Sequence, residues 1–337
     1  MAIFLTLAPR CVATFALAWL MTWASPALGQ GNEVVPLLVG YSALNPPSSL
    51  VWLMKEEGLY EENNLQPFLI FMRGGTTHTQ AVLAGDVQFG QLTGPPGLSA
   101  YLAGGAIVYI ASSQDMMTYQ LVAKPDIRNV SQLAGKTLAI SQYGASADFG
   151  LRLMLRQADI NPEKQVKILQ IGDEPARLAA LIQGHIDGTI VNAPFGLSAK
   201  KYNLNVLLDS AQMNIPYFNT GILTTRAMIR DRSPIVRRFM RGYVKAISYF
   251  KTRQERTKKL LQRFSKIDDP ARLQETWSYY QENILKVPTP SAGGLQTVIN
   301  VMAQSNPKAK SVKPEDLIEP RFVRELESSG YIESLYR

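Results

Sequence analysis

GDVQFGQLTGPPGLSA, residues 85–100, returns 99 residues later in the chain as GHIDGTIVNAPFGLSA, residues 184–199. Six of the sixteen positions are identical in the two stretches, including the opening glycine, one proline and the final GLSA. Similarity at a fixed offset indicates an internal structural repeat. The chain is therefore expected to contain two units that are built alike.

The same offset aligns further segments on both sides of these stretches. Three more pairs of strand-like segments correspond without a gap: LLVGYS at 37–42 with KTLAIS at 136–141, PFLIFM at 67–72 with VKILQI at 166–171, and 107–109 with 206–208. Between them, apolar residues follow helical spacing at 49–57, 76–84, 147–157 and 175–183. Alternating strands and helices predict an α/β lobe with a largely parallel sheet for each unit.

The two expected lobes need connections. Each repeat ends in an extended segment, TYQLVA at 118–123 and NTGILTT at 219–225, and we interpret these segments as two crossover strands. Lobe 1 is then expected to comprise residues 34–121 and 222–337, and lobe 2 residues 122–221. Two crossovers between two lobes predict a hinge.

The C-terminal part is predicted to be helical and to pack on lobe 1. Ser233 is expected to cap a helix with Pro234 in its first turn, and apolar residues recur at helical spacing from 235 to 250. Further helices are predicted at 270–285, 294–304 and 321–328. This C-terminal extension completes the predicted α/β architecture.

Basic residues are concentrated in the same extension. The chain has a net charge of +8, and residues 226–266 contain 14 Lys or Arg against Asp231 and Glu255. Such a patch can bind nucleic acid. However, many of these residues fall off the apolar stripe of the predicted helix, so we interpret them as a solvated helix face and expect no nucleic-acid partner.

The first 29 residues are predicted to be a cleaved signal peptide. Arg10 precedes the apolar stretch CVATFALAWLMTW at 11–23, and small residues then place the cleavage after Gly29, with Ala24 as the second candidate. An uncleaved anchor helix is the alternative. Cys11 comes before the apolar stretch, the reverse of a lipid-modified signal. The mature chain is therefore expected in the periplasm and not as a lipoprotein.

Candidate binding residues lie where the predicted strands end. In parallel α/β sheets, ligands bind beyond the carboxyl ends of the strands, beside the amino ends of the following helices. Most residues at these places are small or carry a hydroxyl or amide, which are also ordinary turn and cap residues. The candidates are Ser42, Asn45, Gly74, Gly75, Thr76, Thr93, Gly94, Ser113, Tyr143, Gly144, Ser146, Asn192, Pro194, Tyr217 and Asn219. Equivalent residues, such as Thr93 and Asn192 or Ser42 and Ser141, are expected to face each other across one cleft.

Residue types that carry catalysis are scarce. Neither of the two histidines, His78 and His185, has the spacing of a metal site or a catalytic triad. Because Cys11 is the only cysteine, the mature chain is expected to have no thiol nucleophile and no thiolate metal site. We therefore expect no catalytic residue, no metal and no cofactor. Whether Arg73 or His78 contacts a ligand stays open at this point.

Several segments resemble one family of binding proteins. SQLAGKTLAISQYGAS at 131–146, RLAALIQGHIDGTIVNAP at 177–194 and FNTGILTT at 218–225 are similar to ABC-importer solute-binding proteins of the nitrate, sulfonate and taurine type. That group also includes binders of thiamine-pyrimidine precursors. The resemblance covers essentially the whole mature chain and implies the type II periplasmic-binding-protein fold.

The resemblance also implies a function. A member would act as a monomer, bind a small organic or oxyanion solute in the interlobe cleft, and deliver it to an ABC permease and its ATPase. The binding loops carry over onto residues 42–45, 74–76, 91–94, 143–146 and 192–194. Two alternatives stay open. One is an enzyme like the thiamine-pyrimidine synthases, whose cysteine-rich iron motif and substrate histidine have no counterpart here. The other is a ligand-sensing binding protein without a transport role.

Overall fold

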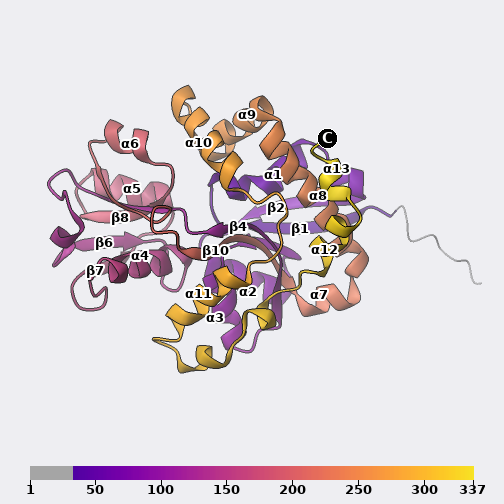
Figure 1. Ribbon diagram of the computed structural model, residues 1–337, viewed down its shortest axis with the longest axis horizontal. Coiled ribbons are helices and arrows are strands. Elements are labelled where there is room, and N and C mark those ends of the chain that lie inside the picture. Colours follow the sequence, from indigo (N-terminus) through magenta and orange to yellow (C-terminus); the bar gives the residue numbers. More distant parts are fainter. Residues whose placement is uncertain (1–32) are drawn as a thin grey trace, which may run out of the picture. The chain divides into compact units, whose positions relative to one another are not determined.

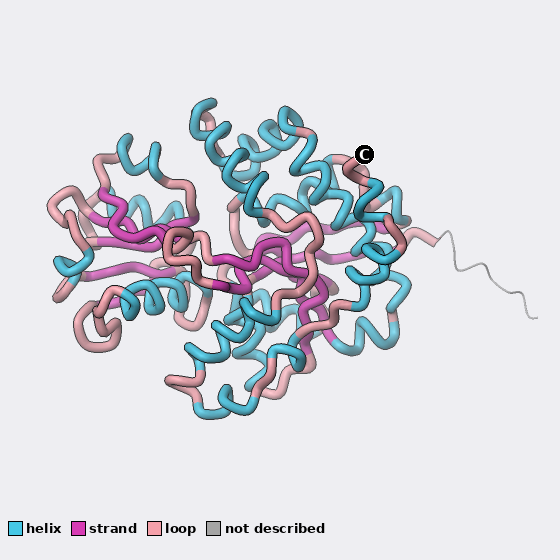
Figure 2. Tube along the Cα trace, viewed as in Figure 1, coloured by secondary structure: helices cyan, strands magenta, loops and turns pink. Residues whose placement is uncertain are grey.

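The computed structural model describes residues 33–337, and the predicted signal peptide lies outside the described residues. In this part of the chain two five-stranded β-sheets are each flanked by helices (Figures 1 and 2). The first sheet consists of β1 (Val35–Tyr41), β2 (Leu65–Phe71), β3 (Phe89–Leu92), β4 (Ile107–Met116) and β10 (Pro216–Thr225). The second consists of β5 (Tyr119–Ala123), β6 (Thr137–Ile140), β7 (Lys167–Gln170), β8 (Gly188–Asn192) and β9 (Asn205–Asp209).

The two sheets have the same strand order, which confirms the repeat predicted from the sequence. The first runs β2-β1-β3-β10-β4 and the second β7-β6-β8-β5-β9. The strands β1 to β4 correspond in order to β6 to β9, at the predicted offset. In each sheet the second strand of this order, β1 or β6, pairs in parallel with both of its neighbours. One antiparallel strand, β10 or β5, is inserted from the other part of the chain. We call each sheet with its helices a lobe.

The chain passes between the lobes twice, at residues 117–118 and 210–215. These two connections lie side by side, because the backbone N–H of Met117 donates to the carbonyl of Ile215 (3.2 Å). All of β5 belongs to the second sheet and all of β10 to the first. The predicted lobe boundaries at 121/122 and 221/222 therefore cut through these two strands, and each passage between the lobes comes a few residues earlier in the chain.

Helices fill the connections and the C-terminal extension. The first lobe has α1 (Leu50–Glu56), α2 (Gly75–Ala84) and α3 (Gly94–Leu102), and the second has α4 (Ser146–Gln157), α5 (Glu174–Ile182) and α6 (Gly196–Lys201). The extension contains α7 (Arg226–Asp231), α8 (Ser233–Thr252), α9 (Gln254–Ser265), α10 (Pro270–Asn283), α11 (Ala292–Met302), α12 (Arg321–Ser328) and α13 (Tyr331–Ser334). Short 3-10 turns occupy η1 (Pro46–Ser49), η2 (Glu61–Asn63), η3 (Val130–Leu133), η4 (Pro307–Ser311) and η5 (Pro314–Leu317). No helix within residues 33–337 is both long and apolar enough to cross a membrane.

Two helices inside the repeated stretch were not predicted from the sequence. Helix α3 begins at Gly94 and carries Pro95 and Pro96 in its first turn. A Gly-Pro-Pro-Gly run is typical of a turn. However, the N–H groups of a first helical turn have no partner within the helix, so prolines at these positions remove no helical hydrogen bond. Helix α6 lies in the corresponding part of the second lobe, but it begins at Gly196, three residues later than the 99-residue offset would place it.

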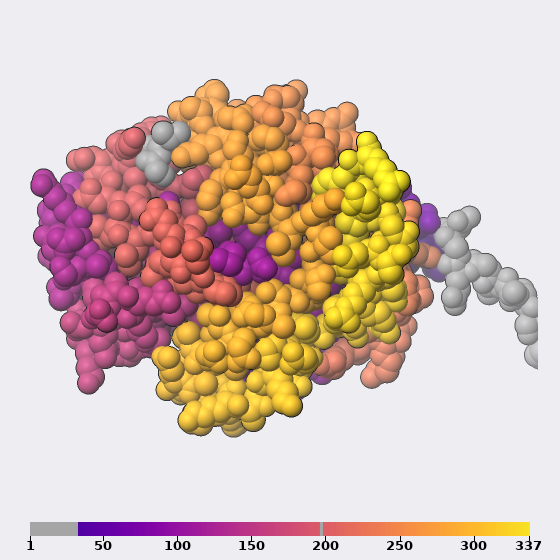
Figure 3. Space-filling model, viewed as in Figure 1, coloured from indigo at the N-terminus to yellow at the C-terminus, as the bar shows by residue number. Residues whose placement is uncertain are grey.

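The C-terminal extension packs on the first lobe, as predicted. The apolar stripe of α8 is buried against the first sheet, where the ring of Phe239 stacks on Phe89 with 4.1 Å between ring centres. Burying such a side chain contributes about 2–3 kcal/mol. Figure 3 shows the C-terminal segments, orange to yellow, spread over the face in view. Ser233 is the first residue of α8 rather than its cap, and the cap residue, Arg232, makes no side-chain capping bond.

Acidic residues elsewhere in the first lobe and its extension compensate much of the basic charge of this extension. Lys245 pairs with Glu62, and both Arg253 and Arg256 pair with Glu57 at the end of α1. Two more pairs join the extension to α1 and α12: Arg263 with Glu56 and Arg237 with Glu325. The exposed pairs among these, such as Arg237 with Glu325, contribute little stability individually. They support the interpretation of the basic patch as a solvated helix face.

Candidate functional site

Loops from the two lobes meet in two hydrogen-bonded pairs. Asn45, which caps η1 after β1, donates from Nδ2 to Oδ1 of Asn192 at the end of β8 (3.1 Å). The hydroxyl of Thr93, after β3, is hydrogen-bonded to the hydroxyl of Ser146, which begins α4. All four residues follow the carboxyl ends of parallel strands, which is where ligands bind in such sheets.

These pairs differ from the expected facing of equivalent residues. The loop after β1 meets the loop after β8, and the loop after β3 meets the loop after β6. In the internal repeat, β1 is equivalent to β6 and β3 to β8. The contact between the loops after β1 and β8 is therefore equivalent to the contact between the loops after β6 and β3. The lobes are thus arranged like the halves of a twofold dimer, in which a loop contacts the non-equivalent loop of the other half.

Glu174 holds the side chain of Asn192 in place. Its Oε2 accepts hydrogen bonds from the backbone N–H (2.9 Å) and from Nδ2 (2.7 Å) of Asn192. Burial raises the pKa of Glu174, while Arg177, Asn192 and Arg272 lower it. Sequence reasoning missed this residue. The 99-residue offset could have found it, because Glu174 corresponds to the candidate Gly75 at the start of the equivalent helix.

Arg177 stabilises the position of Glu174 relative to β8. Its side chain is buried and donates to Thr189 Oγ1 (3.1 Å), to the carbonyl of Gly172 (2.7 Å) and to the carbonyl of Ile190 (2.9 Å). The guanidinium stays charged in proteins. It therefore balances the carboxylate of Glu174 and ties the start of α5 to β8.

At one rim of the interlobe boundary, the loop after β2 contacts the second lobe. Arg73 lies 3.5 Å from Asp173, but 76% of its side chain is exposed, so the ion pair contributes little. Gly74 has a φ of 81°, and a Cβ atom there would overlap Oε1 of Gln142. The backbone angle favours glycine at this position, whereas the overlap with the end of the flexible Gln142 side chain could be relieved by a change of rotamer.

A cluster of hydroxyls and rings surrounds the Thr93–Ser146 pair. The ring of Tyr217, on β10, stacks on Phe149 of the second lobe with 5.4 Å between ring centres. Burial raises the pKa of Tyr217 well above its usual value, and the nearby hydroxyls of Ser146 and Thr93 act in the opposite direction. The Tyr217 hydroxyl is buried close to the hydroxyls of Ser146 and Thr93, but it forms no hydrogen bond of normal geometry with a described residue.

A second polar cluster lies where the chain crosses between the lobes. Asn219 Nδ2 donates to Gln114 Oε1 and to Thr118 Oγ1, both at 2.8 Å. The Tyr280 hydroxyl, from α10, donates to the carbonyl of Ala193 in the second lobe. Gln114 Nε2 is buried without a partner among the described residues. Sequence reasoning missed Gln114, Thr118 and Tyr280, and no local signal marks them.

Some candidates lie away from the contacts between the lobes. Gly94 packs against Phe218 and α11, and the buried hydroxyl of Ser113 donates to the carbonyl of Thr220 (3.2 Å), so both sit inside the first lobe. Tyr143 is half exposed and donates to the carbonyl of Ile168 on the edge strand β7 (2.9 Å). The adjacent Gly144 N–H bonds to Asp148 (3.0 Å). Of the remaining candidates, Ser42, Thr76 and Pro194 are half-buried, and Gly75 packs against Pro96 of its own lobe.

His78 is buried inside the first lobe and does not reach the interlobe contacts. Its ring fills the space left by Gly40 and Gly90, which are paired across β1 and β3, and a Cβ atom on Gly40 would overlap Nε2. Neither ring nitrogen has a hydrogen-bond partner among the described residues. Burial lowers the pKa of His78 from 6.5 to about 4.

This burial predicts acid sensitivity. Between about pH 6.5 and pH 4 the unfolded chain binds a proton at His78 and the native chain does not, so the free energy of unfolding falls as the pH falls. The pKa difference corresponds to about 3 kcal/mol. Urea unfolding at pH 7 and at pH 4 measures how much the free energy of unfolding falls between the two pH values. This decrease should be about 3 kcal/mol smaller in His78→Leu than in the unsubstituted protein. Equal losses in the two proteins would contradict the assignment of the buried, uncharged ring.

Comparisons with known proteins agree with this architecture. The family model described as NMT1/THI5 like matches residues 45–257. A protein of Brucella abortus (strain 2308) that carries the name "Putative binding protein BAB2_1146" is 22% identical over 237 residues, which cover 69% of this chain and 73% of that protein.

Two solved structures share the fold at low sequence identity. The alkanesulfonate-binding protein SsuA from Xanthomonas axonopodis pv. citri, bound to MOPS, has a TM-score of 0.68 and 18% identity, covering 84% of this chain and 96% of that one. The desulfurization enzyme DSZB has a TM-score of 0.63 and 14% identity, covering 87% of this chain and 99% of that one. The chain thus has the periplasmic-binding-protein fold, which both a binding protein and an enzyme use.

Proposed function

Because this chain belongs to the NMT1/THI5 like family, we propose that it is the periplasmic solute-binding component of an ABC importer. It is secreted through its signal peptide and binds a small solute between its two lobes. It then delivers the solute to a permease with its ATPase. The protein performs no catalysis in this role.

The observation that carries this proposal is a set of buried polar atoms without partners beside the boundary between the lobes. The Tyr217 hydroxyl lies next to the Thr93–Ser146 pair, and Gln114 Nε2 lies where the chain crosses between the lobes. A buried polar atom without a hydrogen bond lowers the stability of the folded protein by about 1–3 kcal/mol. A solute that supplies these bonds recovers that free energy, which supports binding at this boundary.

The two lobes also supply a mechanism. Asn45 and Thr93 of the first lobe reach Asn192 and Ser146 of the second only when the lobes are together. The paired connections at 117–118 and 210–215 can act as the hinge. A solute that contacts both sides shifts the population toward the closed form, which the permease would recognise.

The chemistry of the site bears on the solute. Amides and hydroxyls dominate it, and Glu174 is the carboxylate among them. Its Oε2 is occupied by Asn192, while Oε1 accepts no hydrogen bond from a described residue. A carboxylate oxygen accepts and never donates when ionised. Of the classes open at the start, this favours a solute that offers N–H or O–H groups, such as a pyrimidine or an amino sulfonate, over nitrate.

The test is solute-dependent closure. A panel of sulfonates, taurine, nitrate and aminopyrimidines should contain a compound that raises the melting temperature and reduces the radius of gyration in small-angle scattering. Absence of both effects for every compound would count against solute capture and for a role without transport. Stimulation of the permease-bound ATPase by the loaded protein would separate transport from sensing.

The DSZB likeness makes an enzyme the competing function, because the same fold there carries catalysis. Within residues 33–337 no group of His, Cys, Asp and Glu could hold a metal ion. An enzyme would consume the compound that induces closure. Incubating that compound with the protein and measuring its concentration over hours decides between the two: constant concentration supports binding, and turnover overturns it.

A further inference from the structure

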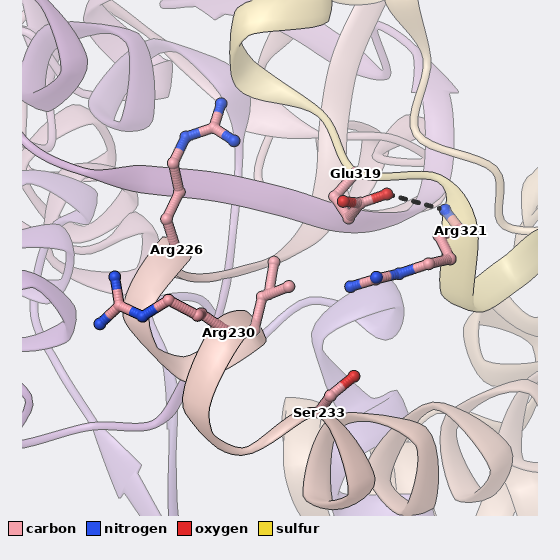
Figure 4. Close-up of a pocket in the computed structure, with 6 residues that line it drawn as sticks. Arg226, Arg230, Ser233, Glu319 and Arg321 are labelled. Atoms are coloured by element: carbon pink, nitrogen blue, oxygen red, sulfur yellow. Dashed lines mark hydrogen bonds between the residues drawn. The ribbon is translucent and has the colours of Figure 1, made fainter.

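An open pocket lined by three arginines lies on the first lobe (Figure 4). Its volume is about 320 Å³, and its lining residues come from α7, the start of α8, and the start of α12 with the segment just before it. These residues are Arg226, Ile229, Arg230, Ser233, Glu319 and Arg321. The volume falls in the range of pockets that hold small ligands.

The pocket is separate from the boundary between the lobes. Strand β10 begins at Pro216, next to the crossing between the lobes, and ends at Thr225, directly before α7. Ten residues of strand span roughly 30 Å. A ligand in this pocket therefore touches none of the residues proposed to bind the solute.

Positive charge in the pocket is only partly compensated. Arg230 pairs with Asp231, but Arg226 donates to the neutral carbonyl of Asp316, and neither Arg226 nor Arg321 forms an ion pair with a described carboxylate. Glu319, the acidic lining residue, accepts from the backbone N–H of Arg321 (3.2 Å). This contrasts with α8 and α9, where several arginines are paired with carboxylates of the same lobe.

The arginines come from two separate segments, and in Figure 4 the side chains of Arg226 and Arg230 point in different directions from α7. In Figure 4, Arg321 extends toward α7, while Arg226 and Arg230 stand on α7 itself, and Ser233 lies at the near end of α8. Ser233 Oγ accepts a hydrogen bond from Arg237 (3.1 Å), which leaves its O–H free to donate. Guanidinium groups bind oxyanions through paired N–H donors, and a phosphate offers oxygens to donors on several sides.

We propose that this arginine pocket is a second binding site and that it takes a phosphate group. The group belongs either to a soluble phosphate ester or to the headgroup of a membrane lipid, since both present the same oxygens to the arginines. Because the pocket is exposed, binding should weaken as the salt concentration rises.

The experiment measures two kinds of probe at low ionic strength. Titration calorimetry follows inorganic phosphate and glycerol 3-phosphate, and co-sedimentation follows phosphatidylcholine vesicles with and without phosphatidic acid. Binding of the soluble probes assigns a free phosphate ester, and binding only to phosphatidic acid vesicles assigns a lipid headgroup. In either case Arg226→Gln with Arg321→Gln should weaken binding at least about tenfold.

A matched variant removes the same charge elsewhere. Lys164 and Lys259 are exposed, and Lys164→Gln with Lys259→Gln should leave binding unchanged. No binding of any probe by the unsubstituted protein would overturn the proposal. Equal weakening in both double variants would also overturn it, because the attraction would then come from the net charge of the protein. The solute-closure test is independent of either result.

Discussion

Replacing Asn192 with phenylalanine is expected to weaken solute binding by at least about 100-fold, or about 3 kcal/mol. The side chain stands between Asn45 of the first lobe and Glu174 of its own lobe. A phenyl ring can neither accept from Asn45 nor donate to Glu174, and its greater volume keeps the two loops apart. The variant should therefore remain open in small-angle scattering with the solute that closes the unsubstituted protein.

The melting temperature of this variant should change little, because Asn192 is half-buried at the meeting of the lobes and outside either core. A matched control is Asn300→Phe on the exposed side of α11, where the amide oxygen accepts a hydrogen bond from Gln296 (2.7 Å). This control should bind the solute normally. Normal binding by Asn192→Phe would place the solute somewhere other than between these loops.

Replacing Arg177 with methionine should lower the free energy of unfolding by about 3–5 kcal/mol. The substitution keeps much of the volume but removes three hydrogen bonds, and it leaves the carbonyls of Gly172 and Ile190 without their donor. It also removes a cation that balances the buried carboxylate of Glu174. Urea denaturation at pH 7 measures the change.

Arg237→Met is the control for this variant. Arg237 forms a bidentate ion pair with Glu325, but its side chain is 48% exposed. Its loss should therefore change the free energy of unfolding by no more than about 1 kcal/mol. Similar losses in both variants would show that burial of Arg177 is not what gives it its large effect. The pKa of Glu174 should also rise further in Arg177→Met, because Arg177 lowers it in the unsubstituted protein.

Local patterns in the sequence predicted most of the architecture. The apolar stripe of α8 follows from side-chain spacing within one helix, and its burial on the first sheet agrees with that spacing. The correspondence of β1 to β4 with β6 to β9 follows from the 99-residue offset. The first feature depends on residues that are close in the sequence, and the second on a constant sequence offset. Both can therefore be predicted without the tertiary structure.

The candidate site was predicted only in part. Asn45, Thr93, Ser146 and Asn192 were found because they follow strand ends, and the structure brings them together. Gly94 also follows a strand end, whereas Ser113 lies within β4, which continues to Met116, and both face the interior of the first lobe. Which way a loop residue points depends on the packing of the next helix, and no spacing rule gives that direction.

The sequence by itself therefore determined two α/β lobes of equal topology and the strand ends at which binding residues gather, while the structure placed the two connections earlier in the chain than predicted, at 117–118 and 210–215. The tertiary structure alone decided which loops meet, since the chain crosses twice and sets the lobes in a twofold relation that pairs non-equivalent loops. It also brought Tyr280 of the C-terminal extension to Ala193, 87 residues earlier in the chain. Such contacts depend on how separate elements pack in space, and nothing near Tyr280 in the sequence carries that information.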